Sequence, residues 1–158
     1  MVNWDEIAEA KDADRKKIVE DRANSDANKK ATETALNDWM SGLFDKLEES
    51  IAARNAQIPL PGKRITSNRL GKTGFQLSSG RAIQKIEVQR NREEILMTVR
   101  SSGPDIDGTQ TTDERQFLLN PTGGEFTATI HTGYEHGTAL TLDGLRDTII
   151  STFAWYVS

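Results

Sequence analysis

Residues 82–101 constrain the fold most, because they read as two β-strands joined by a charged turn. Ile86 and Val88 alternate with polar residues, and Ile95, Met97 and Val99 repeat this pattern after the turn. Alternation with a period of two is typical of a strand with one buried face and one solvated face. The connection at residues 90–93 contains no glycine, so we expect a loop of about four or five residues rather than a tight turn.

Two amphipathic helices are predicted to cover the buried face of this hairpin. From residue 36 the apolar side chains recur at spacings of three and four over several turns: Leu36, Trp39, Met40, Leu43, Phe44, Leu47 and Ile51. Such a stripe is typical of a helix that packs on a sheet. A second helix is predicted from about residue 142 to residue 156, with Thr141 as its N-cap and with Leu145, Ile149 and Phe153 on one face.

The remaining strands are predicted by shorter alternating segments. They lie at residues 74–78, around Phe117 and Leu119, at 125–131 and at 138–140, whereas residues 102–112 read as a loop. The sequence therefore predicts an α+β fold, an antiparallel β-meander of about four to six strands with one face covered by a long N-terminal helix and a C-terminal helix. We expect a single α+β domain at residues 31–158, preceded by a charged helical arm at residues 1–30.

The arm has helical propensity but few apolar residues. Asn3 is the predicted N-cap, and Trp4, Ile7 and Ile18 are isolated apolar side chains among charged neighbours. Extending the heptads of residues 36–47 backwards places only polar side chains on the seam between residues 22 and 33, which argues against a conventional coiled coil. Two interpretations remain open. The arm is either a solvated, partly ordered tail or an interaction helix that uses Trp4, Ile7 and Ile18 as anchors in a partner or in a second copy.

Composition excludes several classes of protein. The 158 residues include no cysteine, which excludes disulfides, thiol catalysis and cysteine-ligated zinc. The N-terminus has neither a basic region nor an apolar core of the kind found in signal peptides, and no apolar run approaches the ~20 residues that span a bilayer. We therefore expect a soluble cytoplasmic protein with no membrane partner.

The middle of the chain is basic. Residues 51–100 carry 10 basic and 3 acidic side chains, in a chain whose net charge is −4. Five of these cations are candidate anion contacts: Lys63, Arg64, Arg69, Lys72 and Arg81. They would suit an electrostatic nucleic-acid-binding domain that uses residues 63–100, although Phe75 is the only aromatic side chain there for a base to stack on. Alternatively, the cations pair with carboxylates across the solvated face of the same sheet.

No motif predicts a catalytic, cofactor-binding or metal site. Gly71-Lys72-Thr73 lacks the earlier glycine of a phosphate loop, and the loop that begins Asp105-Ile106-Asp107-Gly108 lacks the later ligands of a calcium loop. His131, His136 and Glu135 only flank a predicted turn. The favoured expectation is a non-enzymatic protein–protein interaction or self-association module. The alternatives are the nucleic-acid-binding domain and a small-ligand-binding domain or enzyme with a pocket between helix and sheet.

Overall fold

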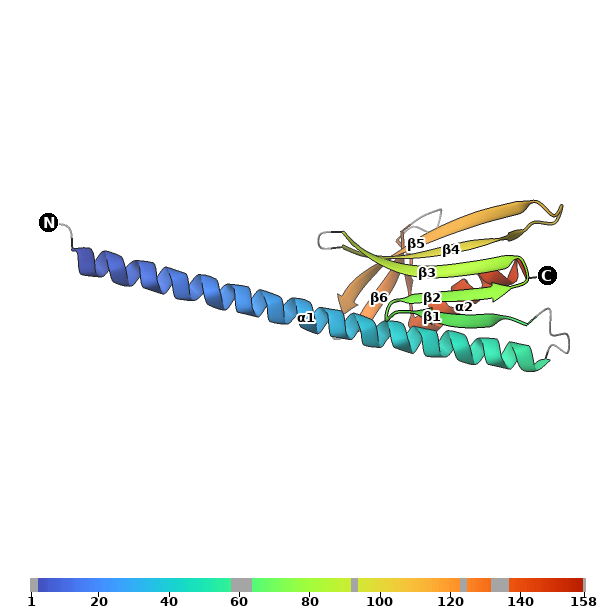
Figure 1. Ribbon diagram of the computed structural model, residues 1–158, viewed down its shortest axis with the longest axis horizontal. Coiled ribbons are helices and arrows are strands. Elements are labelled where there is room, and N and C mark those ends of the chain that lie inside the picture. The colour runs from blue at the N-terminus through green and yellow to red at the C-terminus, as the bar shows by residue number, and fades with distance from the viewer. Residues whose placement is uncertain (1–2, 58–63, 92–93, 123–124, 132–136, 158) are drawn as a thin grey trace. The chain divides into compact units, whose positions relative to one another are not determined.

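The computed structural model describes residues 3–57, 64–91, 94–122, 125–131 and 137–157 (Figure 1). The chain divides into two compact units, Met1–Ala35 and Leu36–Ser158, which are described separately below. Helix α1 spans Trp4–Gln57 and supplies residues to both units. Its start matches the predicted cap, because the Asn3 side-chain oxygen accepts hydrogen bonds from the backbone N–H groups of Asp5, at 3.1 Å, and Glu6, at 3.4 Å.

The second unit holds one antiparallel sheet whose strands follow one another in chain order (Figure 1). The strands are β1 (Thr66–Leu70), β2 (Gly74–Ser79), β3 (Ala82–Asn91), β4 (Glu94–Pro104), β5 (Gln110–Thr122), β6 (Glu125–Ile130) and β7 (Ala139–Leu140). Helix α2, Leu142–Ala154, follows the last strand. The α+β class and the antiparallel meander are confirmed, with seven strands instead of the four to six expected.

Three local predictions were wrong. Strand β1 was not predicted, because all five of its residues are exposed and its sequence carries no alternation. The segment 102–112 is a loop only between Pro104 and Gln110, since β4 and β5 extend into it and pair there. The β3–β4 connection is also shorter than expected, because Asn91 pairs with Glu94 and leaves only residues 92 and 93, which lie outside the described residues.

Both helices cover the same face of the sheet. The strand register aligns Phe75 with Ile86 and Ile86 with Val99, so these apolar side chains share one face. The ring of Phe44, from the second half of α1, stacks on Phe75 with 4.8 Å between ring centroids. On the same face, the buried Gln84 side chain donates a hydrogen bond to the Ile149 carbonyl oxygen of α2 at 3.0 Å.

The core of the second unit lies between this face and the two helices. Its fully buried large side chains come from α1, four of the strands and α2: Leu36, Met40, Leu43, Phe44, Leu47, Phe75, Leu77, Ile86, Met97, Phe117, Leu119 and Phe153. The opposite face of the sheet carries charged side chains, among them Lys85, Glu87 and Arg100. The sheet therefore has one buried and one solvated face, as its alternation predicts.

Candidate functional site

Four large apolar side chains in the described part of the arm are exposed, and three of them share one face of the helix, whereas Val19 lies off that face. Trp4 is 76% exposed, Ile18 is 52% exposed and Ile7 is 39% exposed. Together with Lys11, Asp14 and Arg22 they follow one another at spacings of three or four residues, which places all six on one face of an α-helix. This apolar–cationic face of the arm is defined by Trp4, Ile7, Lys11, Ile18 and Arg22, with Asp14 between Lys11 and Ile18.

The other side of the arm helix is acidic. Asp5, Glu9, Asp12 and Glu20 fall roughly opposite Ile7 and Ile18 at about 100° per residue. Every described residue from position 3 to position 31 is exposed. The arm is thus a solvated helix with an uneven distribution of charge and with three exposed apolar side chains on one face.

Arg69, one of the predicted anion contacts, is occupied within the second unit. Its Nε donates to Glu48 Oε1 at 2.7 Å, another guanidinium nitrogen pairs with Asp45, and the group lies 5.7 Å from the centroid of the Phe44 ring. The hydrogen bond to Glu48, followed by the one to Asp45, raises the pKa of Arg69. This guanidinium therefore joins strand β1 to helix α1.

The other predicted anion contacts that the structure describes lie at both ends of strand β2, with Arg64 at the same end as Arg81. Lys72 precedes strand β2 and Arg81 follows it, so these two residues lie at opposite ends of that strand. Arg64 is exposed just before β1, and Lys63 lies outside the described residues. Two further cations of the basic middle form ion pairs on the solvated face, Lys85 with Glu87 at 2.9 Å and Arg100 with Glu114 at 3.1 Å.

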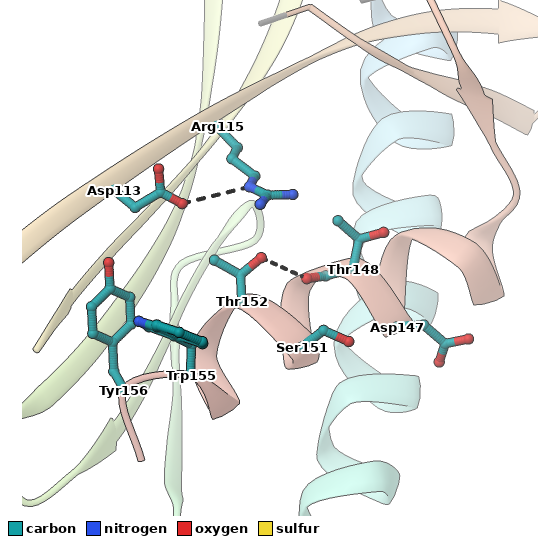
Figure 2. A pocket seen from close by; sticks show the side chains of 8 residues that line it. All are labelled: Asp113, Arg115, Asp147, Thr148, Ser151, Thr152, Trp155 and Tyr156. Carbon is teal, nitrogen blue, oxygen red and sulfur yellow. Dashed lines mark hydrogen bonds and ion pairs between the residues drawn. The ribbon is translucent and has the colours of Figure 1, made fainter. Parts of the chain in front are cut away.

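A groove of about 570 Å³ lies between strand β5 and helix α2 (Figure 2). We call it the α2–β5 groove and define it by its lining: Asp113 and Arg115 from β5, Asp147, Thr148, Ser151 and Thr152 from α2, and Trp155 and Tyr156 just after α2. A volume of this size is typical of pockets that bind small molecules or side chains. A second hollow of about 580 Å³ shares Trp155 and is otherwise lined by Pro104, Asp105, Ile106 and Ala154.

Tyr156, which lines the α2–β5 groove, is in close contact with a glycine of strand β4. Tyr156 is 9% exposed, and a Cβ atom placed on Gly103 would lie only 2.7 Å from the Tyr156 Cβ and 3.0 Å from its ring. Only glycine permits this approach of β4 to the end of α2. Trp155, the neighbouring residue, is 63% exposed and available to a ligand.

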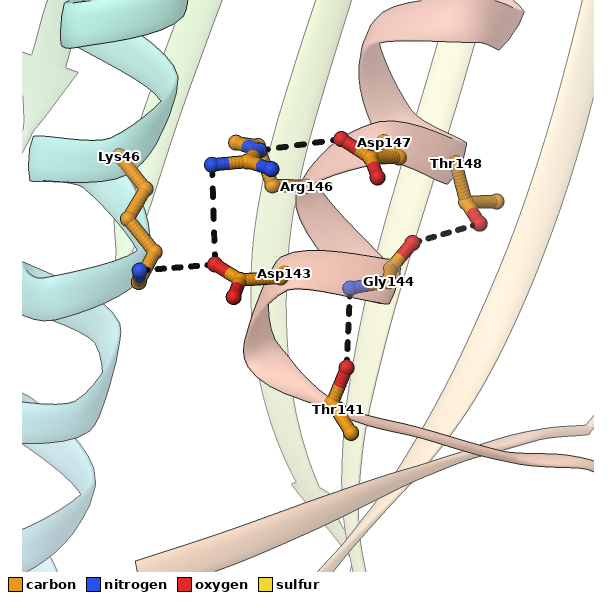
Figure 3. A network of polar contacts seen from close by, with 7 residues as sticks. All are labelled: Lys46, Thr141, Asp143, Gly144, Arg146, Asp147 and Thr148. Atoms are coloured by element: carbon orange, nitrogen blue, oxygen red, sulfur yellow. Dashed lines mark hydrogen bonds and ion pairs between the residues drawn. The ribbon is translucent and has the colours of Figure 1, made fainter.

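Helix α2 is held at its first turn by a polar network (Figure 3). Thr141 caps the helix as predicted, because its side-chain oxygen accepts a hydrogen bond from the Gly144 N–H at 3.1 Å. Lys46 of α1 pairs with Asp143 at 2.8 Å, and Arg146 lies 3.6 Å from the same carboxylate. The hydrogen bond from Lys46 is the main cause that lowers the pKa of Asp143.

We expect Asp143 to titrate below the usual range of an aspartate, and Lys46→Met to move its pKa back towards that range. A lowered folded-state pKa means that the ion pair stabilises the fold above the unfolded-state pKa of about 4. This contribution is lost as the pH falls through the folded-state pKa. The measurement is the side-chain carboxyl carbon shift of Asp143 against pH, with Lys85→Met on the opposite face of the sheet as the control. An unchanged Asp143 titration in Lys46→Met would contradict this contact.

The two motifs that lack the residues of a phosphate loop and of a calcium loop lie in turns between strands. Gly71 has a positive φ of 71° in the turn between β1 and β2, and the Asp107 carboxylate accepts a hydrogen bond from the Thr109 N–H within the β4–β5 turn. Within the described residues, no group of three or more His, Asp or Glu side chains is placed to hold a metal ion. Glu135 and His136 lie outside those residues. Among the described helices, none is both long and apolar enough to cross a membrane.

Sequence reasoning missed the α2–β5 groove, although one signal for it was present. Asp113 and Arg115 continue the alternation of Phe117 and Leu119, so the register places these two charged side chains on the helix-covered face of β5. Charged residues on the buried side of a strand mark a place where no helix covers the sheet or where a partner is bound. The chain matched no known protein in comparisons with family models, curated proteins and solved structures.

Proposed function

We propose that the protein is a non-enzymatic interaction module that self-associates through the apolar–cationic face of its arm. The observation that supports this most is the exposure of Trp4, Ile7 and Ile18 on one face of a helix whose residues are all exposed from position 4 to position 31. An isolated helix that is polar over most of its surface has little stability in water, because most helical stability comes from packing. A second helix packed on this face supplies the missing burial.

The composition of this face suits a helix–helix contact. Each large apolar side chain contributes about 1.5–3 kcal/mol when fully buried. Lys11 lies between Ile7 and Ile18, and Arg22 lies one turn beyond Ile18. Long basic side chains in such positions cover apolar surface with their stems and keep their charges in water. Asp14 on the same face, and acidic side chains at the edges of a partner helix, complete the charge balance.

Light scattering tests the proposal with the full-length protein. We expect a molar mass that is a multiple of 17.6 kDa, and the triple substitution Trp4→Ala, Ile7→Ala and Ile18→Ala should weaken association at least tenfold and return the mass towards the monomer. The far-UV helix signal should also fall on dilution, since a lone arm is marginal as a helix.

A matched control comes from the other side of the arm. Asp12→Ala, Lys16→Ala and Glu20→Ala also replace three exposed side chains of the arm helix but leave its anchors intact, so the molar mass should not change. A full-length protein that stays monomeric at high concentration, with a helix signal independent of dilution, would sink the proposal.

A further inference from the structure

The α2–β5 groove offers more hydrogen-bond acceptors than donors. The Thr148 hydroxyl donates to the Gly144 carbonyl oxygen at 2.9 Å (Figure 3), and the Thr152 hydroxyl donates to the Thr148 carbonyl oxygen at 2.9 Å (Figure 2). With their hydrogens engaged in this way, both hydroxyl oxygens present lone pairs to the groove. The carboxylates of Asp113 and Asp147 add further acceptors, so the lining matches a ligand that is rich in N–H donors.

The charge of the lining favours a cation. Asp105, Asp113 and Asp147 line the groove and the neighbouring hollow, and Arg115 is the one basic side chain among the residues that line them. Arg115 is itself directed to one of these carboxylates, because its Nε lies 3.5 Å from Asp113 Oδ2. Asp147 is paired as well, because Arg146 Nε donates to its Oδ1 at 3.1 Å. The three carboxylates still outnumber these two arginines, so a cationic group that enters the groove meets a small excess of negative charge.

Trp155 links the two hollows and provides an aromatic surface for the ligand. Its side chain lines both the α2–β5 groove and the hollow beside Ile106, and it is 63% exposed although it is among the largest apolar side chains of the unit. Tryptophan is the best aromatic partner for an ammonium or guanidinium group. Ile106, at 92% exposure, extends the apolar surface beyond it.

We infer that this groove binds a protein segment in which an arginine or lysine stands next to an apolar residue. The basic side chain enters the α2–β5 groove, donates to Asp113 and the Thr152 hydroxyl oxygen, and stacks on Trp155. Asp147 lies about two helical turns before Trp155 and acts through its charge rather than by a direct hydrogen bond. The apolar neighbour covers Ile106 and Pro104 in the adjoining hollow. This site is independent of the arm, because every residue that forms it belongs to the second unit.

The test is a nuclear magnetic resonance titration of the full-length protein with three tripeptides. The probes are acetyl-Leu-Arg-Leu-amide and its analogues with citrulline, which has the same shape without the charge, and with glutamate. We expect saturable shifts of the Trp155 indole N–H and of the Ser151 and Thr152 amides with the arginine peptide. The citrulline peptide should bind at least tenfold more weakly, and the glutamate peptide should not bind.

Substitutions distinguish a cation site from an anion site. Trp155→Ala should abolish binding, and Asp113→Asn combined with Asp147→Asn should weaken it at least tenfold. Arg115→Gln should strengthen binding of the arginine peptide several-fold, because it removes the competing cation, whereas an anion site would lose affinity. Glu87→Gln on the solvated face of the sheet makes the same carboxylate-to-amide change and should leave binding unchanged.

Several results would overturn the inference. These are equal binding of the arginine and citrulline peptides, preference for the glutamate peptide, and absence of saturable shifts with all three. A drop in molar mass in Trp155→Ala would mean that a second copy of the chain fills the groove, which also overturns it. Thermal unfolding of each variant checks that the fold is intact, and the arm substitutions should not alter peptide binding.

Discussion

Replacing Phe44 with alanine is expected to lower the free energy of unfolding of the second unit by about 3–5 kcal/mol. Phe44 is 1% exposed, and its ring stacks on that of Phe75 with 4.8 Å between centroids and 15° between planes. The substitution leaves a cavity between α1 and the sheet and also removes the ring beneath Arg69. Denaturant unfolding followed by near-ultraviolet circular dichroism measures the effect, because this signal reports tertiary packing.

Ile106→Ala provides the control for Phe44→Ala. Ile106 is also a large apolar side chain of the second unit, but it is 92% exposed, so its truncation should change the free energy of unfolding by less than about 0.5 kcal/mol. A loss below about 1 kcal/mol in Phe44→Ala would show that the second half of α1 does not pack on the sheet through this residue.

Gly103→Ala is expected to destabilise the fold by about 1–3 kcal/mol although it adds a single methyl group. The new Cβ would lie 2.7 Å from the Tyr156 Cβ, and this atom stands next to the backbone, so it cannot move without shifting the end of helix α2. The same shift displaces Trp155, and we expect its indole resonance to move. The measurements are denaturant unfolding and the indole region of the proton–nitrogen spectrum.

A double-mutant cycle with Tyr156→Ala isolates this contact. Removing the tyrosine ring eliminates the two 3.0 Å approaches to the ring and frees the end of the chain to adjust, so Gly103→Ala should cost less in that background. An equal cost in both backgrounds would contradict a role for the Gly103–Tyr156 contact. Ser102→Ala, at the half-buried neighbouring position, controls for a general sensitivity of β4.

The parts of the fold that were predicted correctly are those with a periodic apolar pattern. The hairpin of β3 and β4, the buried stripe of α1 from Leu36 to Ile51, and α2 with its Thr141 cap all follow from spacing and capping chemistry. Burial of one face forces apolar residues into a period of two or 3.6, and that period is visible in a single chain. The caps were visible because an unsatisfied N–H at a helix start selects a small set of side chains.

The parts that were missed are polar. Strand β1 exposes all five of its residues, and the first half of β5 carries Asp113, Glu114 and Arg115, so neither has the apolar alternation of a half-buried strand. They are strands because their backbone groups pair with β2 and β4 along continuous ladders. Pairing of this kind depends on the register with the neighbouring strand, and the composition of the strand itself does not record it.

By itself the sequence determined the class of the fold, the helix that covers the sheet, and the exposed anchors Trp4, Ile7 and Ile18 of the arm. Only the tertiary structure decided that Arg69 is held by Asp45 and Glu48, and that Asp113 and Arg115 meet Trp155 across the α2–β5 groove. Periodicity records which side of an element is buried, because a buried face requires apolar side chains at a regular spacing along the chain. A groove depends instead on strand register and on where a helix stops covering a sheet, and both are set by packing between segments that lie far apart in the sequence.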